Sequence, residues 1–146
     1  MDSFMLAAFE QARASQVEGG IPIGSVLVHD QKIIGRGHNR RVQSGSPVFH
    51  AEMDALENAG RQLARVYREC TIYTTLSPCA MCSGAILLYG IPRVVVGENQ
   101  TFNGEEEHLR SRGVDVTVLQ NPDCIGLMRE FIAARPGLWN EDVGED

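Results

Sequence analysis

The sequence predicts an α/β fold, a three-layer α/β/α sandwich around a five-stranded mixed sheet. Two strand-like runs joined by a short link lie in the first third of the chain, and three further apolar runs alternate with helix-like segments. Such alternation buries a sheet between two layers of helices. With 146 residues, 43% of them hydrophobic, the chain is long enough for one core. We therefore expect residues 1–146 to form a single domain.

The first element expected is a helix over residues 4–17. Phe4, Ala8 and Ala12 recur at helical spacing and would lie on one face, and Met5 and Phe9 would lie beside them. Gly19 and Gly20 end this helix, and Pro22 prevents its continuation. Strands are expected next at residues 25–29 and 32–38, because the two-residue link between them suits a hairpin.

The middle of the chain predicts helix, strand and helix. A second helix should run over residues 50–63, with four inward apolar residues: Ala55, Leu56, Ala59 and Leu63. Residues 71–75 are rich in β-branched side chains and predict a strand. Ser77 is the expected N-cap of a third helix, with Pro78 at its first position and Gly90 at its end.

The last third predicts two strands and a closing helix. Residues 93–97 form a short apolar run typical of a strand buried on both faces. The polar segment 104–112 is long enough for a helical crossover, so the next strand, at 114–119, should be parallel to it. The final helix carries an apolar stripe made of Ile125, Met128, Phe131 and Ile132.

Charge and hydropathy point away from nucleic acids and membranes. The formal net charge is −6, whereas nucleic-acid binders usually carry a basic patch. The one dense basic cluster, interpreted as a solvated strand end, comprises Arg36, Arg40 and Arg41. No segment approaches the roughly 20 apolar residues of a membrane span, and the N-terminus lacks the pattern of a secretory signal. We expect a cytoplasmic protein that acts on a small molecule.

Four cysteines divide into two kinds. Cys70 and Cys124 lie in apolar stretches and are expected to be buried thiols. Cys79 and Cys82 form a C-x-x-C pair that follows Pro78, and His50-Ala51-Glu52 precedes them in the chain. The combination of H-x-E with P-C-x-x-C is the known signature of zinc nucleobase deaminases. It predicts a zinc-dependent hydrolytic deaminase.

The residue types fit this chemistry. Zinc favours sulfur and nitrogen ligands, so His50, Cys79 and Cys82 are the predicted metal ligands. Cysteines three residues apart at a helix start can point to one side, and the helix N-terminus favours their thiolates. Three protein ligands leave the fourth position of a tetrahedral zinc open, which marks a catalytic site.

Glu52 is the predicted catalytic acid and base. A carboxylate beside the metal can accept a proton from water and deliver it to a ring nitrogen and then to the leaving amine. Residues two apart in a helix do not face the same way. We therefore expect His50 at the helix edge, outside helical dihedral angles, and Glu52 within the first turn.

Non-catalytic interpretations of the motif are weaker. A thioredoxin-type C-x-x-C would follow the first strand of its fold, whereas two strands and a helix precede the strand before this one. A structural zinc site needs a fourth ligand, and the nearby candidates, Cys70 and His38, form no second closed pair. A zinc-stabilised binding module remains an alternative, and it would not depend on Glu52.

Beyond the motif, the chain resembles fungal-type cytosine deaminases of the cytidine deaminase-like superfamily. The resemblance runs from about Gly19 to Gly144. It is carried by residues 35–39, 56–58, 74–79, 89–93 and 97–99, by Arg135-Pro136, by Trp139 and by residues 141–144.

The resemblance implies a homodimer of α/β/α subunits, each with one catalytic zinc, that converts cytosine to uracil and ammonia. It implies that Asn39 and the Ala51 backbone N–H bind the polar edge of the base. Phe102 and Trp139 would form walls of the pocket, and Asp142 would lie near the amino group. A C-terminal aromatic beside a carboxylate suits a lid that excludes water.

Three residues depart from the family pattern and leave the substrate open. Phe49 is bulkier than the aliphatic residue expected before the zinc histidine, while Asn140 and Val42 replace aromatics. Isocytosine, with its amino group on the other ring carbon, guanine, and adenosine in transfer RNA are the alternative substrates. The acidic charge and the closing Trp139 tail argue against transfer RNA.

Overall fold

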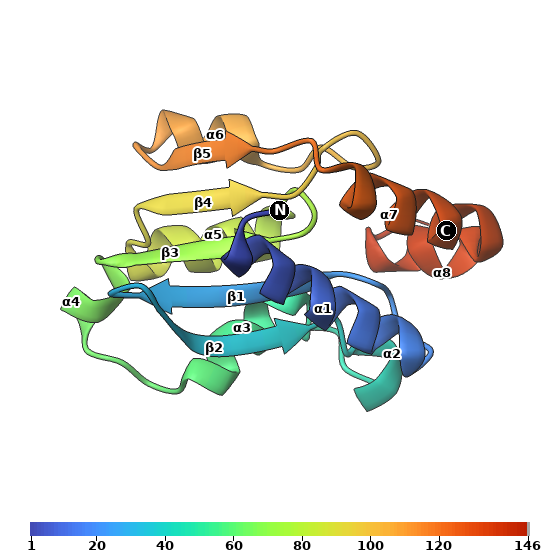
Figure 1. The fold of residues 1–146 in the computed structure, drawn as a ribbon, viewed down its shortest axis with the longest axis horizontal. Helices are drawn as coiled ribbons and strands as arrows, with labels where there is room; N and C mark the ends of the chain where they lie inside the picture. The colour runs from blue at the N-terminus through green and yellow to red at the C-terminus, as the bar shows by residue number, and fades with distance from the viewer. Residues whose placement is uncertain (146) are drawn as a thin grey trace.

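A single five-stranded mixed sheet organises residues 1–145, the part of the chain that the computed structural model describes (Figure 1). Its strands are β1 (Gly24–His29), β2 (Lys32–His38), β3 (Cys70–Thr74), β4 (Arg93–Val96) and β5 (Asp115–Val118). Their order is β2-β1-β3-β4-β5. β1 pairs antiparallel with β2 and β3, whereas β3, β4 and β5 are parallel. The predicted mixed sheet and its parallel last pair are confirmed.

The predicted hairpin between β1 and β2 is also confirmed. Asp30 and Gln31 have φ angles of 52° and 61°. Positive φ at both central residues is the geometry of a type I′ turn, whose twist matches that of the flanking strands.

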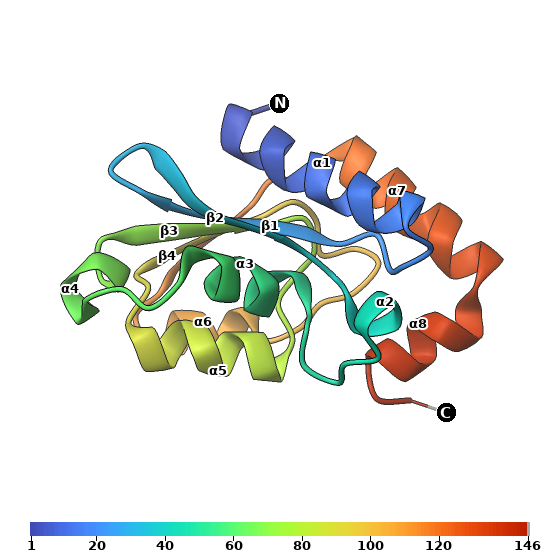
Figure 2. The same ribbon diagram turned by 90° about the horizontal axis from the view of Figure 1, so that it is seen from below.

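Helices cover both faces of the sheet (Figure 2). One layer contains α1 (Ser3–Val17) and α7 (Pro122–Ala134), and the other contains α3 (Ala51–Ala59), α5 (Ala80–Tyr89) and α6 (Glu106–Ser111). Alternate residues of β1 pack on opposite faces of the sheet. Val26 and Val28 pack with Met5 and Ala8 of α1, whereas Leu27 belongs to the hydrophobic core on the other face. No helix among residues 1–145 is long and apolar enough to cross a membrane.

α3 lies unusually close to β2. A Cβ atom added at Gly37 would stand 2.2 Å from the Ala55 backbone nitrogen, and one added at Gly35 would stand 2.3 Å from the Ala55 carbonyl oxygen. Only glycine leaves room for this approach. The two glycines therefore set the position of α3, whose N-terminus carries His50 and Glu52.

The second predicted helix is shorter than expected. It ends at Ala59, and Gly60, with a φ of 77°, turns the chain away. Leu63, predicted to point inward, is 61% exposed and precedes the one-turn helix α4 (Ala64–Tyr67). The apolar spacing of Leu63 was misleading because the glycine stop lies before it.

The prediction of Ser77 as an N-cap and Pro78 as the first helical residue was wrong. α5 begins at Ala80, and Cys79 is its N-cap residue. The Ser77 hydroxyl instead accepts a hydrogen bond from the Gly104 N–H at 2.9 Å. Ser77 thus ties together the two loops that follow β3 and β4.

Three short helices were not anticipated from the sequence: α2 (Arg41–Ser44), α4 and α8 (Pro136–Asp142). α8 folds back from the end of α7, so the two are side by side at one end of the sheet (Figures 1 and 2). Arg41 of α2 forms ion pairs with Glu141 and Asp142 of α8, so the two helices lie next to each other (Figure 2).

Candidate metal centre and active site

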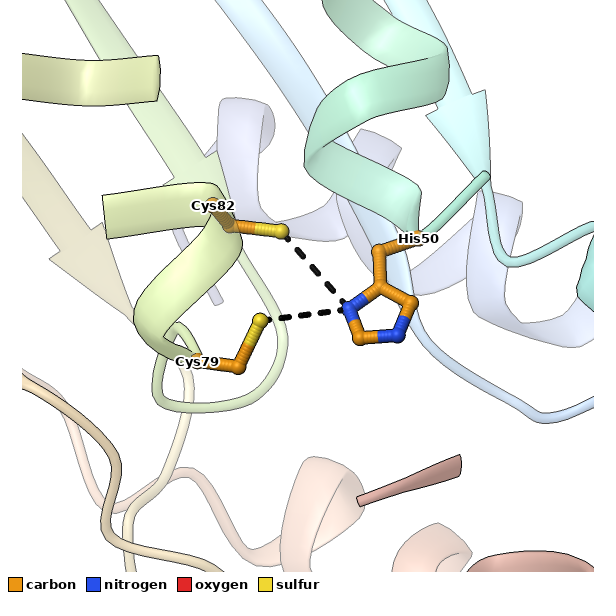
Figure 3. A group of neighbouring side chains, drawn as sticks. All are labelled: His50, Cys79 and Cys82. Atoms are coloured by element: carbon orange, nitrogen blue, oxygen red, sulfur yellow. Dashed lines mark hydrogen bonds between the residues drawn. The ribbon is translucent and has the colours of Figure 1, made fainter. Parts of the chain in front are cut away.

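The predicted site residues meet where the first turns of α3 and α5 face each other. His50 is the N-cap residue of α3, with φ −61° and ψ 162°, and Cys79 is the N-cap residue of α5. Cys82 lies in the first turn of α5. Figure 3 shows both sulfurs directed at the imidazole of His50.

The spacing of these three side chains fits one zinc ion. The His50 Nδ1 atom is 3.4 Å from the Cys79 sulfur and 3.7 Å from the Cys82 sulfur, and the three candidate ligand atoms lie within 4.8 Å of one another. Tetrahedral zinc with ordinary bond lengths separates a nitrogen and a sulfur ligand by about 3.6 Å. The donor set and its spacing therefore suit zinc.

The thiols of the metal-free cluster differ in protonation. The hydrogen bond with Cys82 and, more weakly, that with His50 lower the pKa of Cys79 to about 4, although burial opposes this. The same interaction with Cys79, together with burial, raises the pKa of Cys82 well above its ordinary value. The Cys79 sulfur is therefore a thiolate that can bind a cation, whereas the Cys82 sulfur must first lose its proton.

Burial opposes the protonation of His50, but other groups outweigh it. The hydrogen bond to Cys79 and the nearby charges of Glu52 and Asp142 raise the pKa of His50 to about 8. A neutral imidazole is the form that binds zinc. Metal loading near neutral pH therefore displaces protons from both His50 and Cys82.

Glu52 is a buried carboxyl group beside this cluster. Burial is the main reason that its pKa rises to about 7, and the negative charge of Cys79 adds to the effect. A group with a pKa near the working pH can both accept and donate a proton efficiently. The environment of Glu52 therefore suits an acid and base.

A small cavity opens beside the cluster. It encloses about 330 Å³ of space unfilled by protein atoms, part of which is open to solvent. The predicted residues that line it are His50, Ala51, Glu52, Cys79, Phe102, Trp139 and Asp142. Ala51 contributes the first N–H of α3, an end where helix amides lack intrahelical partners.

An aromatic pair closes one side of this cavity. The rings of Phe102 and Trp139 meet edge to face, with centroids 5.9 Å apart and an interplanar angle of 87°. Trp139 belongs to α8 and is buried. The C-terminal segment therefore covers the cavity as an ordered helix.

Asn39 lies behind the cavity rather than along its wall. Its side-chain amide donates to the Asp142 carboxylate at 3.3 and 3.4 Å, and its Oδ1 accepts from the Arg41 N–H at 3.0 Å. Asp142 itself lines the cavity, 3.7 Å from the His50 Nε2 atom. Asn39 thus reaches the site through Asp142.

The basic cluster interpreted as a solvated strand end is largely paired. Arg36 is exposed, but Arg40 binds the buried Asp54 and Arg41 binds Glu141 and Asp142. Sequence reasoning missed Arg41 at the site because its partners are about 100 residues away. The sequence does offer two signals for this ion pair: the arginines directly after Asn39 and the two acidic residues directly after Asn140.

The cavity also includes apolar residues that were not predicted to belong to the site: Ile23, Leu76 and Val143. The three residues that depart from the family pattern are not among its lining residues within positions 1–145. Phe49 stacks under the Arg40 guanidinium at 4.4 Å, and Val42 lines an outer groove beside α8. Asn140 accepts a hydrogen bond from the Glu145 N–H through its carbonyl.

Comparisons with known proteins agree with the geometry. Residues 1–98 match the family described as the cytidine and deoxycytidylate deaminase zinc-binding region. The chain is 55% identical to a cytosine deaminase of Candida albicans over 139 residues, covering 94% of this chain and 93% of that protein. It is 40% identical over 139 residues to a tRNA-specific adenosine deaminase of Streptococcus pyogenes, covering 88% and 87%.

A solved structure shares the fold. It comes from work on A-to-I editing by tRNA:A34 deaminases at the wobble position of transfer RNA. The TM-score is 0.75 at 27% identity, and the match covers 87% of this chain and 99% of that one.

Proposed function

Because this chain belongs to the zinc-binding cytidine and deoxycytidylate deaminase family, we propose that it deaminates a free pyrimidine base, converting cytosine to uracil and ammonia. The single observation that carries the choice of a small substrate is the small cavity that Trp139 of α8 covers on one side. This enclosure suits a base without a sugar. The 55% identity to a cytosine deaminase supports the choice of base.

His50, Cys79 and Cys82 would hold the zinc ion, which supplies Lewis-acid activation of water near neutral pH. Glu52 accepts the proton of the attacking water and passes it to the ring nitrogen. It then takes the second proton of that water from the hydroxyl now on the ring carbon and delivers it to the amino group. The carbon–nitrogen bond breaks, a carbonyl forms and ammonia leaves. In the metal-free protein, burial raises the pKa of Glu52 to about 7, so this carboxyl group is protonated more readily than an exposed glutamate.

The remaining predicted residues would orient the base. The Ala51 N–H and Asn39 would bind its polar edge. For this, the Asn39 amide, which donates to both Asp142 oxygens and does not line the cavity, would turn toward the base. Phe102 and Trp139 would hold its faces by apolar contact. The Asp142 carboxylate would accept from the amino group that is being released.

Deamination of adenosine in transfer RNA is the second candidate, favoured by the 40% identity to a tRNA-specific adenosine deaminase. A nucleotide within a polymer would need an open entrance and phosphate contacts. The net charge of −6 and the position of Trp139 over the cavity count against it.

We also propose that two copies form a homodimer in the cytoplasm. α5 presents an apolar outer surface made of Ala80, Gly84 and Leu88, with Leu88 75% exposed, and Tyr89 continues it. Small residues along a helix allow close approach of a partner, and an exposed apolar patch of this kind marks an interface. Sedimentation of wild-type protein and of Leu88→Glu tests the proposal, since the charged variant should be monomeric.

The substrate is tested with purified, zinc-loaded protein and an assay for released ammonia. The panel is cytosine, isocytosine, guanine, cytidine, and transfer RNA with an adenosine at the wobble position. We expect release from cytosine and none from cytidine or RNA. Turnover of RNA that weakens steeply with salt would favour the second candidate instead.

A further inference from the structure

Arg41 joins α2 to the C-terminal helix that covers the cavity. Its Nη1 atom lies 2.7 Å from Glu141 Oε1 and 3.0 Å from Asp142 Oδ1, and its Nη2 atom lies 2.9 Å from Glu141 Oε2. Its Nε atom donates to the Pro47 carbonyl at 3.1 Å. One guanidinium therefore binds two successive carboxylates of α8 and is itself anchored by the loop that leads to His50.

Asp142 is the point at which this contact reaches the active site. Its carboxylate is buried, lines the cavity and accepts from both Arg41 and Asn39. The Arg41 backbone N–H also holds the other end of the Asn39 amide, at 3.0 Å. Arg41 thus fixes both groups that would meet the polar parts of the base, although it does not line the cavity.

α8 needs such an anchor. It has seven residues, and helices this short are not stable by themselves. The ion pair with Glu141 is exposed and contributes little to the stability of α8. The pair with Asp142 is buried and hydrogen-bonded, so its loss would destabilise α8 strongly.

We propose that Arg41 is a positioning residue that fixes the Asp142 carboxylate and α8 over the cavity. Its kinetic consequences rest on the proposed function, but its effect on α8 does not. Without the guanidinium, Asp142 would be a buried carboxylate lacking its cationic partner, and α8 would move away to hydrate it.

The chain contains its own probe for this movement. Trp139 is the one tryptophan in the sequence, lies on α8 and is buried against Phe102. Quenching of its fluorescence by acrylamide therefore measures how well α8 covers the cavity. The measurement uses zinc-loaded protein without substrate.

Arg40 provides a matched control. It is the adjacent arginine and also binds a buried carboxylate, with its Nη2 atom 2.7 Å from Asp54 Oδ1. Asp54 belongs to α3 rather than α8. Arg40→Gln and Arg41→Gln thus each remove the cation from a buried carboxylate, but only the second should release α8.

We expect Arg41→Gln to raise the quenching constant of Trp139 about twofold or more, with an intermediate value for Arg41→Lys and the wild-type value for Arg40→Gln. Lysine keeps the charge but lacks the fork that reaches two carboxylates. Equal quenching of Arg41→Gln and wild type would overturn the proposal. So would an equal rise in both glutamine variants, since this would indicate general loosening.

The kinetic arm measures cytosine deamination by the same proteins. Arg41→Gln should raise KM about tenfold or more, because Asp142 and Asn39 would lose the contact that orients them toward the base, with a smaller change in kcat. An effect confined to kcat would contradict a positioning role. If wild-type protein releases no ammonia from cytosine, the proposed function has failed, and the quenching comparison still decides the role of Arg41.

Discussion

His50 and Glu52 face the same cavity although they are only two residues apart, because His50 stands outside the helix that contains Glu52. The ψ angle of 162° at His50 is extended, and α3 begins at the next residue. The imidazole therefore points to the two sulfurs while the carboxylate enters the cavity from the first turn. This arrangement resolves the conflict between the H-x-E spacing and helical periodicity.

Metal binding should depend on Cys82 and not on Cys70, although both are buried cysteines. We expect Cys82→Ala to weaken zinc binding by more than about 100-fold, since even loss of an outer-shell partner costs 10- to 100-fold. Cys70→Ala should keep one zinc per chain. Metal analysis and thermal melting with and without a chelator check this. Full zinc occupancy in Cys82→Ala would contradict the assigned ligand set.

The burial of Glu52 predicts a pH-dependent stability difference in the metal-free protein. Its pKa is about 7 when folded and 4.5 in the reference state, so the folded chain holds an extra proton between these values and is destabilised, through this group, as pH rises. Glu52→Gln should be nearly neutral near pH 4.5 and stabilising at pH 8. The upper limit is about 3 kcal/mol, since one pKa unit is equivalent to about 1.4 kcal/mol.

Urea unfolding of chelator-treated protein at the two pH values measures this difference. Comparing wild type with the variant measures Glu52 together with its effect on the neighbouring His50 and Cys82. Glu57→Gln, at an exposed position of the same helix, is the control. A destabilising effect of Glu52→Gln at pH 8 would argue against the buried environment described for this carboxyl group.

Trp139 should determine both affinity and selectivity. Truncation to alanine removes the ring that packs on Phe102 and opens the cavity, so we expect KM for cytosine to rise about tenfold or more. The variant should also begin to accept cytidine. Leu138→Ala is the control, because Leu138 lies on the same helix but lines the outer groove. Ammonia release from the two substrates, compared between the two variants, measures both effects.

The close approach of α3 to β2 predicts opposite effects of two glycine substitutions. Gly37→Ala would place a Cβ 2.2 Å from the Ala55 backbone and should destabilise the protein by about 3 kcal/mol or more. At Gly126, on the exposed side of α7, the added methyl would contact nothing within 4 Å, so alanine should stabilise by about 0.5–1 kcal/mol. Thermal unfolding of both variants gives the comparison, and equal effects would refute the steric account.

The strands and the metal ligands could be predicted because their signals are local. The motifs H-x-E and P-C-x-x-C each span at most five residues. Each strand is recognised from alternating apolar and polar residues or from a continuous apolar run. The predicted helix over residues 50–63 was too long. Gly60 ends α3 after Ala59, although the spacing of Leu63 fits the apolar face. Ser77 was misassigned because a serine before proline resembles a cap, whereas its hydroxyl binds Gly104 of another loop.

The cover of the cavity could not be predicted from spacing. Arg41 and Asp142 are 101 residues apart, and neither has a local pattern that indicates the other. The Trp139 segment would ordinarily be interpreted as a chain end, and only the family resemblance suggested a lid. Contacts between distant loops depend on the completed fold, which brings α2 and α8 together (Figure 2).

Zinc titration of the metal-free protein, with ammonia release from cytosine as the readout, tests the central claim most directly. We predict that the rate rises in proportion to zinc up to one ion per chain. Glu52→Gln should bind the same amount of zinc and lose about 10²–10⁴-fold in turnover. Deamination that persists without metal, or at the wild-type rate in the zinc-loaded Glu52→Gln variant, would contradict the assignment of this site.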